Sequence, residues 1–221
     1  MFRSQINGGA LKSKSNQKRG DDSSLFFERK NMGFRLCTID TKYIEFLRSD
    51  RKLYNVFENK DDANFIRKYI GIVFNIGQYH YYAPLSSPKR TDYKVVNGKQ
   101  IIRNDIIPII RIVVQENEEM RLKGTVKLSN MIPVPEKAIF DYDIEREENE
   151  QYKALIEKEY AVLKQKERKI LKNAELLYRQ KTKADILYSG ENANKKPGYL
   201  SATINFKYAE QMHDKYISEH A

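Results

Sequence analysis

The chain has 221 residues, with 40 Lys or Arg against 30 Asp or Glu, and carries a formal charge of +10. This length fits one compact domain, and a hydrophobic share of 40 % suffices for its core. The lone Cys37 excludes an internal disulfide, and the lack of a long apolar run excludes a signal peptide and a membrane-spanning helix. We therefore expect a cytoplasmic protein with no membrane contact.

The charge and the aromatic content together point to a polyanionic partner. A basic excess of this size favours nucleic acid, and 15 Tyr with 10 Phe offer rings on which single-stranded bases stack. A basic, soluble surface and ordinary strand residues explain the same composition equally well. Composition therefore favours RNA or DNA binding without establishing it.

The N-terminal segment differs from the rest of the chain. Residues 1–24 are rich in Gly, Ser, Asn, Gln and Lys and have almost nothing to bury, as is typical of disordered segments. We expect residues 1–31 to form a disordered extension and residues 32–221 to form the single folded domain. In that domain, residues 34–39 predict a strand, and Asp40 then caps a helix with Tyr43, Ile44 and Leu47 on its apolar face.

Residues 69–89, YIGIVFNIGQYHYYAPLSSPK, predict two strands joined by a turn at residues 75–78. Gly77 can adopt positive φ there. The second strand is expected to end near Ala83, because two prolines follow and restrict the backbone. Ser86 and Ser87 would then lie on a stiff loop next to Lys89.

The remaining pattern predicts short strands followed by helices. Residues 93–102 contain an Asn-Gly hairpin, residues 106–114 a strand with an edge or bulge at Pro108, and residues 124–134 further short strands. From residue 144 the apolar residues recur at helical spacing. This spacing lapses at residues 164–169, so the segment could be one helix or two helices with a turn between them. A last helix is predicted at residues 208–217. The fold class is α+β: a compact, bent antiparallel sheet or small barrel flanked by helices, with a helical C-terminal half.

No metal or cofactor motif, no phosphate-binding glycine loop and no serine-nucleophile elbow occur in the sequence. What remains is a set of hydroxyls and cations. RNA carries its own nucleophile, the 2′-OH, so an RNA-cutting enzyme needs only to align the strand, move a proton and stabilise charge. Ser86 or Ser87, with Lys89 and either Arg67 or Lys68, would meet these needs. Read alone, the Ser-Ser-Pro pattern favours a turn that ends a strand.

The segments FRLCTIDTKYIEFL at residues 34–47 and YIGIVFNIGQYHYYAPLSSPK at residues 69–89 resemble the ToxN/AbiQ family, the endoribonuclease toxins of type III toxin–antitoxin and abortive-infection systems. LSNMIPV at residues 128–134 resembles a later segment of the same family. The resemblance implies a sheet similar to that of the MazF/Kid toxins, metal-independent RNA cleavage that leaves a 2′,3′-cyclic phosphate, and a role in phage defence. It also implies an antitoxin RNA, a repeated pseudoknot that the toxin cuts from its precursor, in a ring of three proteins and three RNAs, with cellular or phage mRNA as substrate.

By position, Ser87 matches the essential serine of the family, Ser86 the neighbouring hydroxyl, Lys89 the following lysine and Arg67 a lysine. The family's upstream tyrosine has no tyrosine counterpart here. For RNA binding we predict a set of cations and one ring: Lys68, Tyr69, Arg90, Lys153, Lys164, Lys172 and Arg179. Two other functions stay open, a non-catalytic RNA-binding protein and, more weakly, a DNA-binding regulator, which lacks a helix-turn-helix signature.

Overall fold

The computed structural model describes residues 34–53, 56 and 71–220, and the segment predicted to be an N-terminal extension lies outside them. Strand β1, Arg35–Ile39, leads into helix α1, Thr41–Ser49. The side chain of Asp40 accepts a hydrogen bond from the amide of Lys42 at 2.9 Å, which satisfies one of the free donors at the start of α1. The predicted strand and capped helix are confirmed.

The hairpin predicted at residues 69–89 consists of β2, Gly71–Ile76, and β3, Tyr79–Ser86. Gly77 adopts a φ of +59° in its turn, as expected. The prediction that the strand ends near Ala83 was wrong, because β3 continues through Pro84 and changes its partner. Pro84 lies opposite Gly71 at the end of β2, whereas Ser86 pairs with Thr125 of β7. A proline is tolerated where a strand leaves one neighbour for another, since its missing donor breaks no continuous ladder there.

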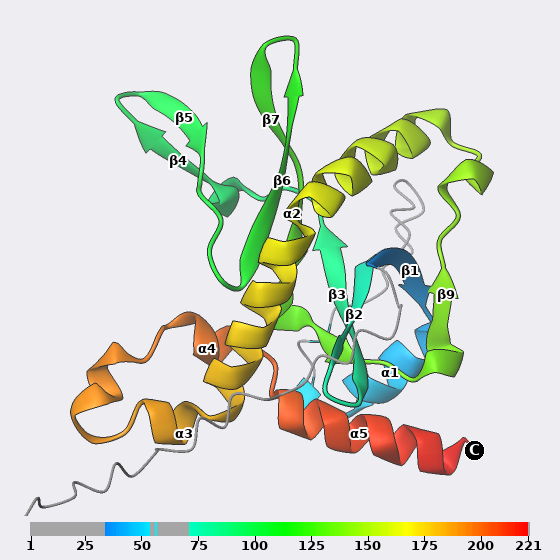
Figure 1. The fold of residues 1–221 in the computed structure, drawn as a ribbon, viewed down its shortest axis with the longest axis vertical. Coiled ribbons are helices and arrows are strands. Elements are labelled where there is room, and N and C mark those ends of the chain that lie inside the picture. The colour runs from blue at the N-terminus through cyan, green and yellow to red at the C-terminus, as the bar shows by residue number, and fades with distance from the viewer. Residues whose placement is uncertain (1–33, 54–55, 57–70, 221) are drawn as a thin grey trace, which may run out of the picture.

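Two further hairpins project from the sheet region (Figure 1). Strands β4, Tyr93–Val96, and β5, Lys99–Ile102, form a two-stranded arm around Asn97 and Gly98, both with positive φ, which confirms the Asn-Gly hairpin. Strands β6, Ile109–Glu116, and β7, Glu119–Lys127, form the other. The turn between them is only the Asn117-Glu118 pair, both residues with positive φ.

Among the described residues the main sheet has the order β6-β7-β3-β2-β1-β9, and β8 also pairs with β3. Strand β8 spans Ile132–Pro133 and β9 spans Ile139–Asp141. All strand pairings among the described residues are antiparallel, which confirms the α+β class with an antiparallel sheet. Short 3₁₀ helices connect the elements: η1 Arg51–Leu53, η2 Arg90–Asp92, η3 Leu128–Asn130, η4 Glu136–Ala138, η5 Ile144–Arg146 and η6 Gly190–Lys195.

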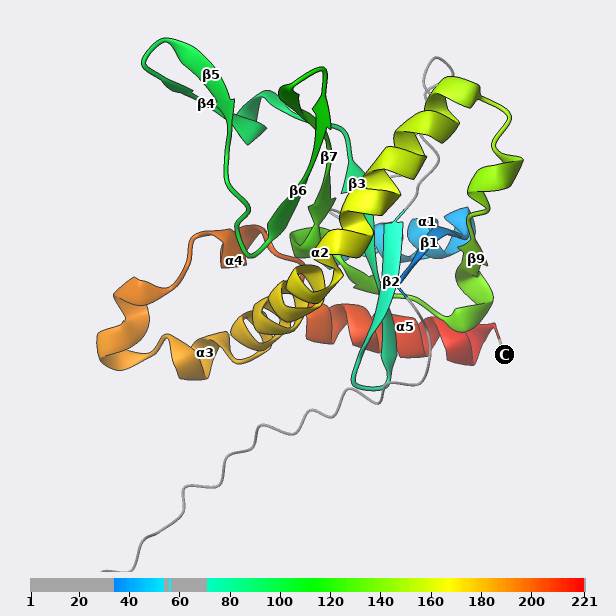
Figure 2. The ribbon, with the colours of Figure 1, turned by 45° about the horizontal axis from the view of Figure 1, so that its top comes forward.

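Helix α2, Glu150–Thr182, crosses the sheet without a break (Figures 1 and 2). The sequence was compatible with one helix or two in this region, and the structure has one. Its buried stripe runs through Ile156, Leu163, Ile170 and Leu177. At the lapse in the apolar pattern, Lys166 instead donates hydrogen bonds to the strand region, so polar contacts hold this part of the helix.

The C-terminal half is helical, as predicted. After α2 come α3, Ala184–Leu187, α4, Tyr199–Ala202, and α5, Phe206–Glu219. Helix α5 packs beside the β2–β3 hairpin (Figure 2), and the buried carboxylate of Glu210 accepts hydrogen bonds from the hydroxyls of Tyr81 and Tyr178. Across the described residues, none of the helices is both long and apolar enough to cross a membrane.

Candidate RNA-cleaving site

A polar row crosses three neighbouring strands on one face of the sheet. Ser86 of β3 lies opposite Thr125 of β7, and Thr125 lies opposite Arg111 of β6. Residues paired in this way point to the same side of a sheet, and Lys127 follows on that side because side chains alternate along a strand. All four side chains are buried. Burying polar and charged groups costs free energy unless they are paired, so this row is a candidate functional site.

The segment that follows Ser86 is anchored over this row by one carboxylate. Asp92 Oδ2 accepts a hydrogen bond from the amide of Lys89 at 2.9 Å, and Asp92 Oδ1 accepts one from Arg111 Nη2 at 3.1 Å. The carbonyl of Asp92 accepts another from the amide of Arg103 at 2.9 Å. The loop at residues 87–91 is therefore fixed at its base, in agreement with the expected stiff loop.

The two adjacent serines have different environments. Ser86 is the last residue of β3; its side chain is buried, and its Oγ donates to the carbonyl of Ser87 at 3.3 Å. Ser87 is exposed, as are Lys89 and Arg90 behind it. The expectation that both serines lie on the loop was wrong for Ser86, because β7 extends the sheet to that residue. The loop thus presents the Ser87 hydroxyl and two cations to the solvent.

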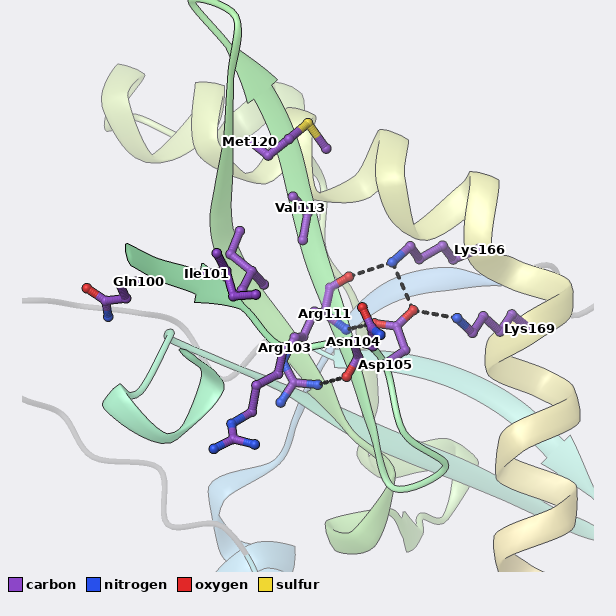
Figure 3. Close-up of a pocket in the computed structure, with 11 residues that line it drawn as sticks. Gln100, Ile101, Arg103, Asn104, Asp105, Arg111, Val113, Met120, Lys166 and Lys169 are labelled. Atoms are coloured by element: carbon purple, nitrogen blue, oxygen red, sulfur yellow. Dashed lines mark hydrogen bonds and ion pairs between the residues drawn. The ribbon is translucent and has the colours of Figure 1, made fainter. Parts of the chain in front are cut away.

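Arg111 ties this loop to the neighbouring surface. Besides Asp92, its guanidinium donates to the carbonyl of Asn104. Its amide donates to Asp105 Oδ1 at 2.7 Å, and Figure 3 shows Arg111 beside Asn104 and Asp105. Its Nε is buried and has no hydrogen-bond partner among the described residues. Arg111 therefore keeps one donor unused in a buried, positively charged setting.

Next to Arg111 lies an open pocket of about 620 Å³ (Figure 3). Residues 100–105 line one side, β6 and β7 the floor, and α2 the other side through Lys166 and Lys169. Both lysines bind Asp105 Oδ2, at 3.1 and 2.6 Å. The lining contains the cations Arg103, Arg111, Lys166 and Lys169 and a single acid, Asp105, so the pocket favours a polyanion.

The structure places the predicted RNA-binding residues in two regions. Arg67, Lys68 and Tyr69 lie outside the described residues. Arg90 lies on the loop at residues 87–91, at the start of η2. The other four, Lys153, Lys164, Lys172 and Arg179, lie along α2. With 100° per residue, these four fall within a wedge of about 100° and spread over about 39 Å of helix. They therefore form a long stripe on α2 and do not gather at Ser87.

The cations of this stripe differ in how they are bound. Lys153 forms an ion pair with Glu145 at 2.8 Å. Lys164 lies 5.6 Å from the centre of the Phe34 ring and 3.8 Å from Glu167. Lys172 and Arg179 are exposed. The stripe is thus available to a partner mainly at its C-terminal end.

Three residues of the site were missed in the sequence: Asp92, Arg111 and Lys127. The available signal was a single charge inside an apolar run, Arg111 between Ile110 and Ile112. Such a charge, if the run is a buried strand, requires a partner or a function. Which partner it has depends on strand register, which the sequence pattern does not specify.

Comparison with known proteins places this geometry in a family. The chain matches the family described as "Toxin ToxN, type III toxin-antitoxin system" over residues 35–214. It is 30 % identical to the endoribonuclease ToxN of Bacillus thuringiensis subsp. kurstaki, over 81 % of this chain and 82 % of the relative. It is 25 % identical to the endoribonuclease AbiQ of Lactococcus lactis subsp. lactis, over 85 % and 92 %.

Solved structures agree with the fold. One, a type III toxin–antitoxin structure in which a non-coding RNA pseudoknot inhibits the toxin selectively, superposes with a TM-score of 0.63 at 26 % identity, covering 83 % of this chain and 97 % of that one. The lactococcal anti-phage endoribonuclease AbiQ superposes with a TM-score of 0.57 at 18 % identity, covering 84 % and 98 %, and supports the fold alone. From the match over most of its length, the chain belongs to the ToxN family of toxins of type III toxin–antitoxin systems.

Proposed function

We propose that this toxin is a metal-independent, sequence-selective endoribonuclease that cuts RNA at the loop presenting Ser87 and Lys89. The observation that carries the proposal is the fixed loop itself: Asp92 holds its base to Arg111, and the exposed Ser87 hydroxyl and two cations stand on it. Rigid placement of donors around a phosphate supplies most of what RNA cleavage needs, because the nucleophile belongs to the substrate.

In the proposed reaction the 2′-oxygen of one nucleotide attacks its own 3′-phosphate. The new 2′-O–P bond forms, the 2′-hydroxyl proton leaves to a base, and the P–O5′ bond breaks as the 5′-oxygen takes up a proton. The products are a 2′,3′-cyclic phosphate and a 5′-hydroxyl. Ser87 hydrogen-bonds the phosphate and aligns it, Lys89 neutralises its charge, and Arg67 is proposed to act as a third donor.

We infer the substrates and the inhibitor from family membership. Two relatives are named endoribonucleases, and a similar solved structure concerns toxin inhibition by an RNA pseudoknot. We extend both properties to this chain. The antitoxin RNA would contact Arg90, the pocket beside Arg111 and the basic stripe of α2, in a ring of three proteins and three RNAs. Free toxin would cut cellular or phage mRNA and so act in phage defence. We also propose that the bent sheet is akin to that of the MazF/Kid toxins.

The test is expression of wild-type protein and of Ser87→Ala, with Ser218→Ala as the control. Ser218 is an exposed serine at the end of α5. Wild type and Ser218→Ala should arrest growth and produce RNA fragments with cyclic phosphate ends, in the presence of EDTA as well when purified. Ser87→Ala should do neither, with its melting temperature unchanged. Growth arrest by Ser87→Ala without cut RNA would instead favour the non-catalytic RNA-binding function.

A further inference from the structure

Lys127 stands out as a buried lysine whose ammonium group has no counterion among the described residues. It ends strand β7, and its side chain is only 8 % exposed. Its Nζ atom makes no hydrogen bond and no ion pair with any described residue. Lys166, by contrast, is less buried and has two oxygen partners, Asp105 Oδ2 and the Arg111 carbonyl. A lysine that serves only the fold is expected to look like Lys166, since a buried charge needs compensation.

The charges around Lys127 make the protonated form of its side chain less favourable. Asp92 attracts it, but both carboxylate oxygens of Asp92 already accept hydrogen bonds, from Arg111 and from the Lys89 amide. Burial lowers the pKa of Lys127; Asp92 opposes this change, and the nearby positive charges of Lys89 and Arg111 lower the pKa further. The cluster thus holds three cations and one acid, and the Nε of Arg111 also lacks a partner among the described residues. An anion that entered this cluster would compensate its excess positive charge.

We propose that Lys127 is a catalytic residue of this toxin, whose Nζ binds a non-bridging oxygen of the scissile phosphate and stabilises the charge that develops there. The inference rests on the proposed ribonuclease function and deepens it. As the 2′-O–P bond forms and the P–O5′ bond breaks, negative charge grows on the phosphorane oxygens. Lys127 keeps its proton throughout and acts through its charge, which is strong because the site is buried. Its position on β7, on the same side of the sheet as Thr125 and Arg111, fixes the place of that charge.

The experiment compares wild type with Lys127→Met and uses Lys123→Met as the matched control. Lys123 lies on the same strand but is paired with Glu116 at 2.6 Å. Single-turnover cleavage is measured on an RNA oligonucleotide that the wild type cuts, and binding is measured on its 2′-O-methyl version. We expect Lys127→Met to slow cleavage by about 10²- to 10³-fold, as for loss of one oxyanion donor, and to weaken binding far less. Lys123→Met should cut at nearly the wild-type rate.

Thermal melting provides the second readout. Removing an uncompensated buried charge should leave the melting temperature of Lys127→Met equal to or above that of the wild type, a result that a structural lysine would not give. Sodium sulfate at constant ionic strength stabilises folded proteins in general, because it is excluded from their surfaces. It should stabilise wild type and Lys123→Met more than Lys127→Met, because an anion that binds the folded site adds to this general effect.

Three outcomes would overturn the assignment: cleavage by Lys127→Met within about threefold of wild type, a large fall in its melting temperature, or equal stabilisation by sulfate. If wild type cuts no RNA while sulfate stabilisation still depends on Lys127, the proposed function fails and the anion site stands. The two failures are therefore distinguishable.

Discussion

Asp92 and Arg111 form an ion pair of 3.1 Å in which the two side chains are only 2 % and 4 % exposed. The pair joins the loop after Ser86 to the middle of strand β6, so it holds the presented hydroxyl in a constant position relative to the buried cations. Removal of one member of such a pair leaves the other as an uncompensated charge in the protein interior.

Asp92→Asn should therefore lower the free energy of unfolding by about 3 to 5 kcal/mol, as is typical for a broken buried pair. The measurement is urea unfolding followed by circular dichroism. Glu119→Gln is the control, because Glu119 pairs with Arg121 at 3.2 Å on the exposed end of the β6–β7 hairpin. Exposed pairs contribute about 1 kcal/mol or less, so equal losses in the two variants would contradict the anchoring role of Asp92.

A second prediction concerns the close contact of β7 with α2 beside Ser86. A Cβ atom added at Gly124 would lie 2.6 Å from Glu159 Oε1 and 3.3 Å from the Ser86 carbonyl oxygen. Because Glu159 is buried, its carboxylate has little room to move. Gly124→Ala should destabilise the protein by about 1 to 3 kcal/mol through overpacking, and should also reduce RNA cleavage by displacing Ser86. Gly198→Ala, where no heavy atom lies within 4 Å, should change stability and cleavage little in the same assays.

Features encoded by neighbouring residues were predicted well from the sequence. The Asp40 cap and the Asn97-Gly98 turn each depend on a few consecutive residues, and both occur as expected. The end of β3 and the continuity of α2 depend on contacts distant in sequence. Ser86 belongs to β3 because Thr125 pairs with it. Near Lys166, where the apolar pattern lapses, Asp105 binds that lysine from a position 61 residues earlier in the chain. No local pattern contains such information.

The site likewise combines residues that a local motif indicates with residues that only the fold brings together. Ser87 and Lys89 were predicted as site residues because a short motif around them resembles one family. The structure presents both at the surface of an anchored loop, and their catalytic role stays a prediction. Asp92, Arg111 and Lys127 belong to three different elements and converge only through strand register. A charged residue in an apolar strand is a recognisable signal, but its role becomes clear only when its neighbours are known.

A third prediction concerns pH. Burial alone would raise the pKa of Asp105, but hydrogen bonds from Lys169, the Arg111 amide and Lys166 lower it overall. A carboxylate with a depressed pKa in the folded state stabilises the protein above its unfolded pKa, about 3.9, and loses this effect as the pH falls through the folded value. Asp105→Asn should thus be clearly less stable than wild type in urea unfolding at neutral pH, and the difference should shrink below about pH 4. A difference that is constant with pH would mean that the ionised form of Asp105 contributes nothing.

The last prediction tests whether the pocket beside Arg111 belongs to the RNA-binding surface. Lys169 is half exposed and can be replaced while Lys166 still holds Asp105. Each lysine that neutralises an RNA phosphate contributes about 0.7 to the slope of log affinity against log salt for a single strand. Lys169→Met should weaken binding of the 2′-O-methyl RNA and make this slope shallower by about that amount, measured by fluorescence anisotropy over a salt series. Lys215→Met on α5, which removes a lysine 3.7 Å from Glu219, is the control and should leave the slope unchanged. If both variants keep the wild-type slope, the RNA does not pass through this pocket, and the cations there serve only to hold Asp105.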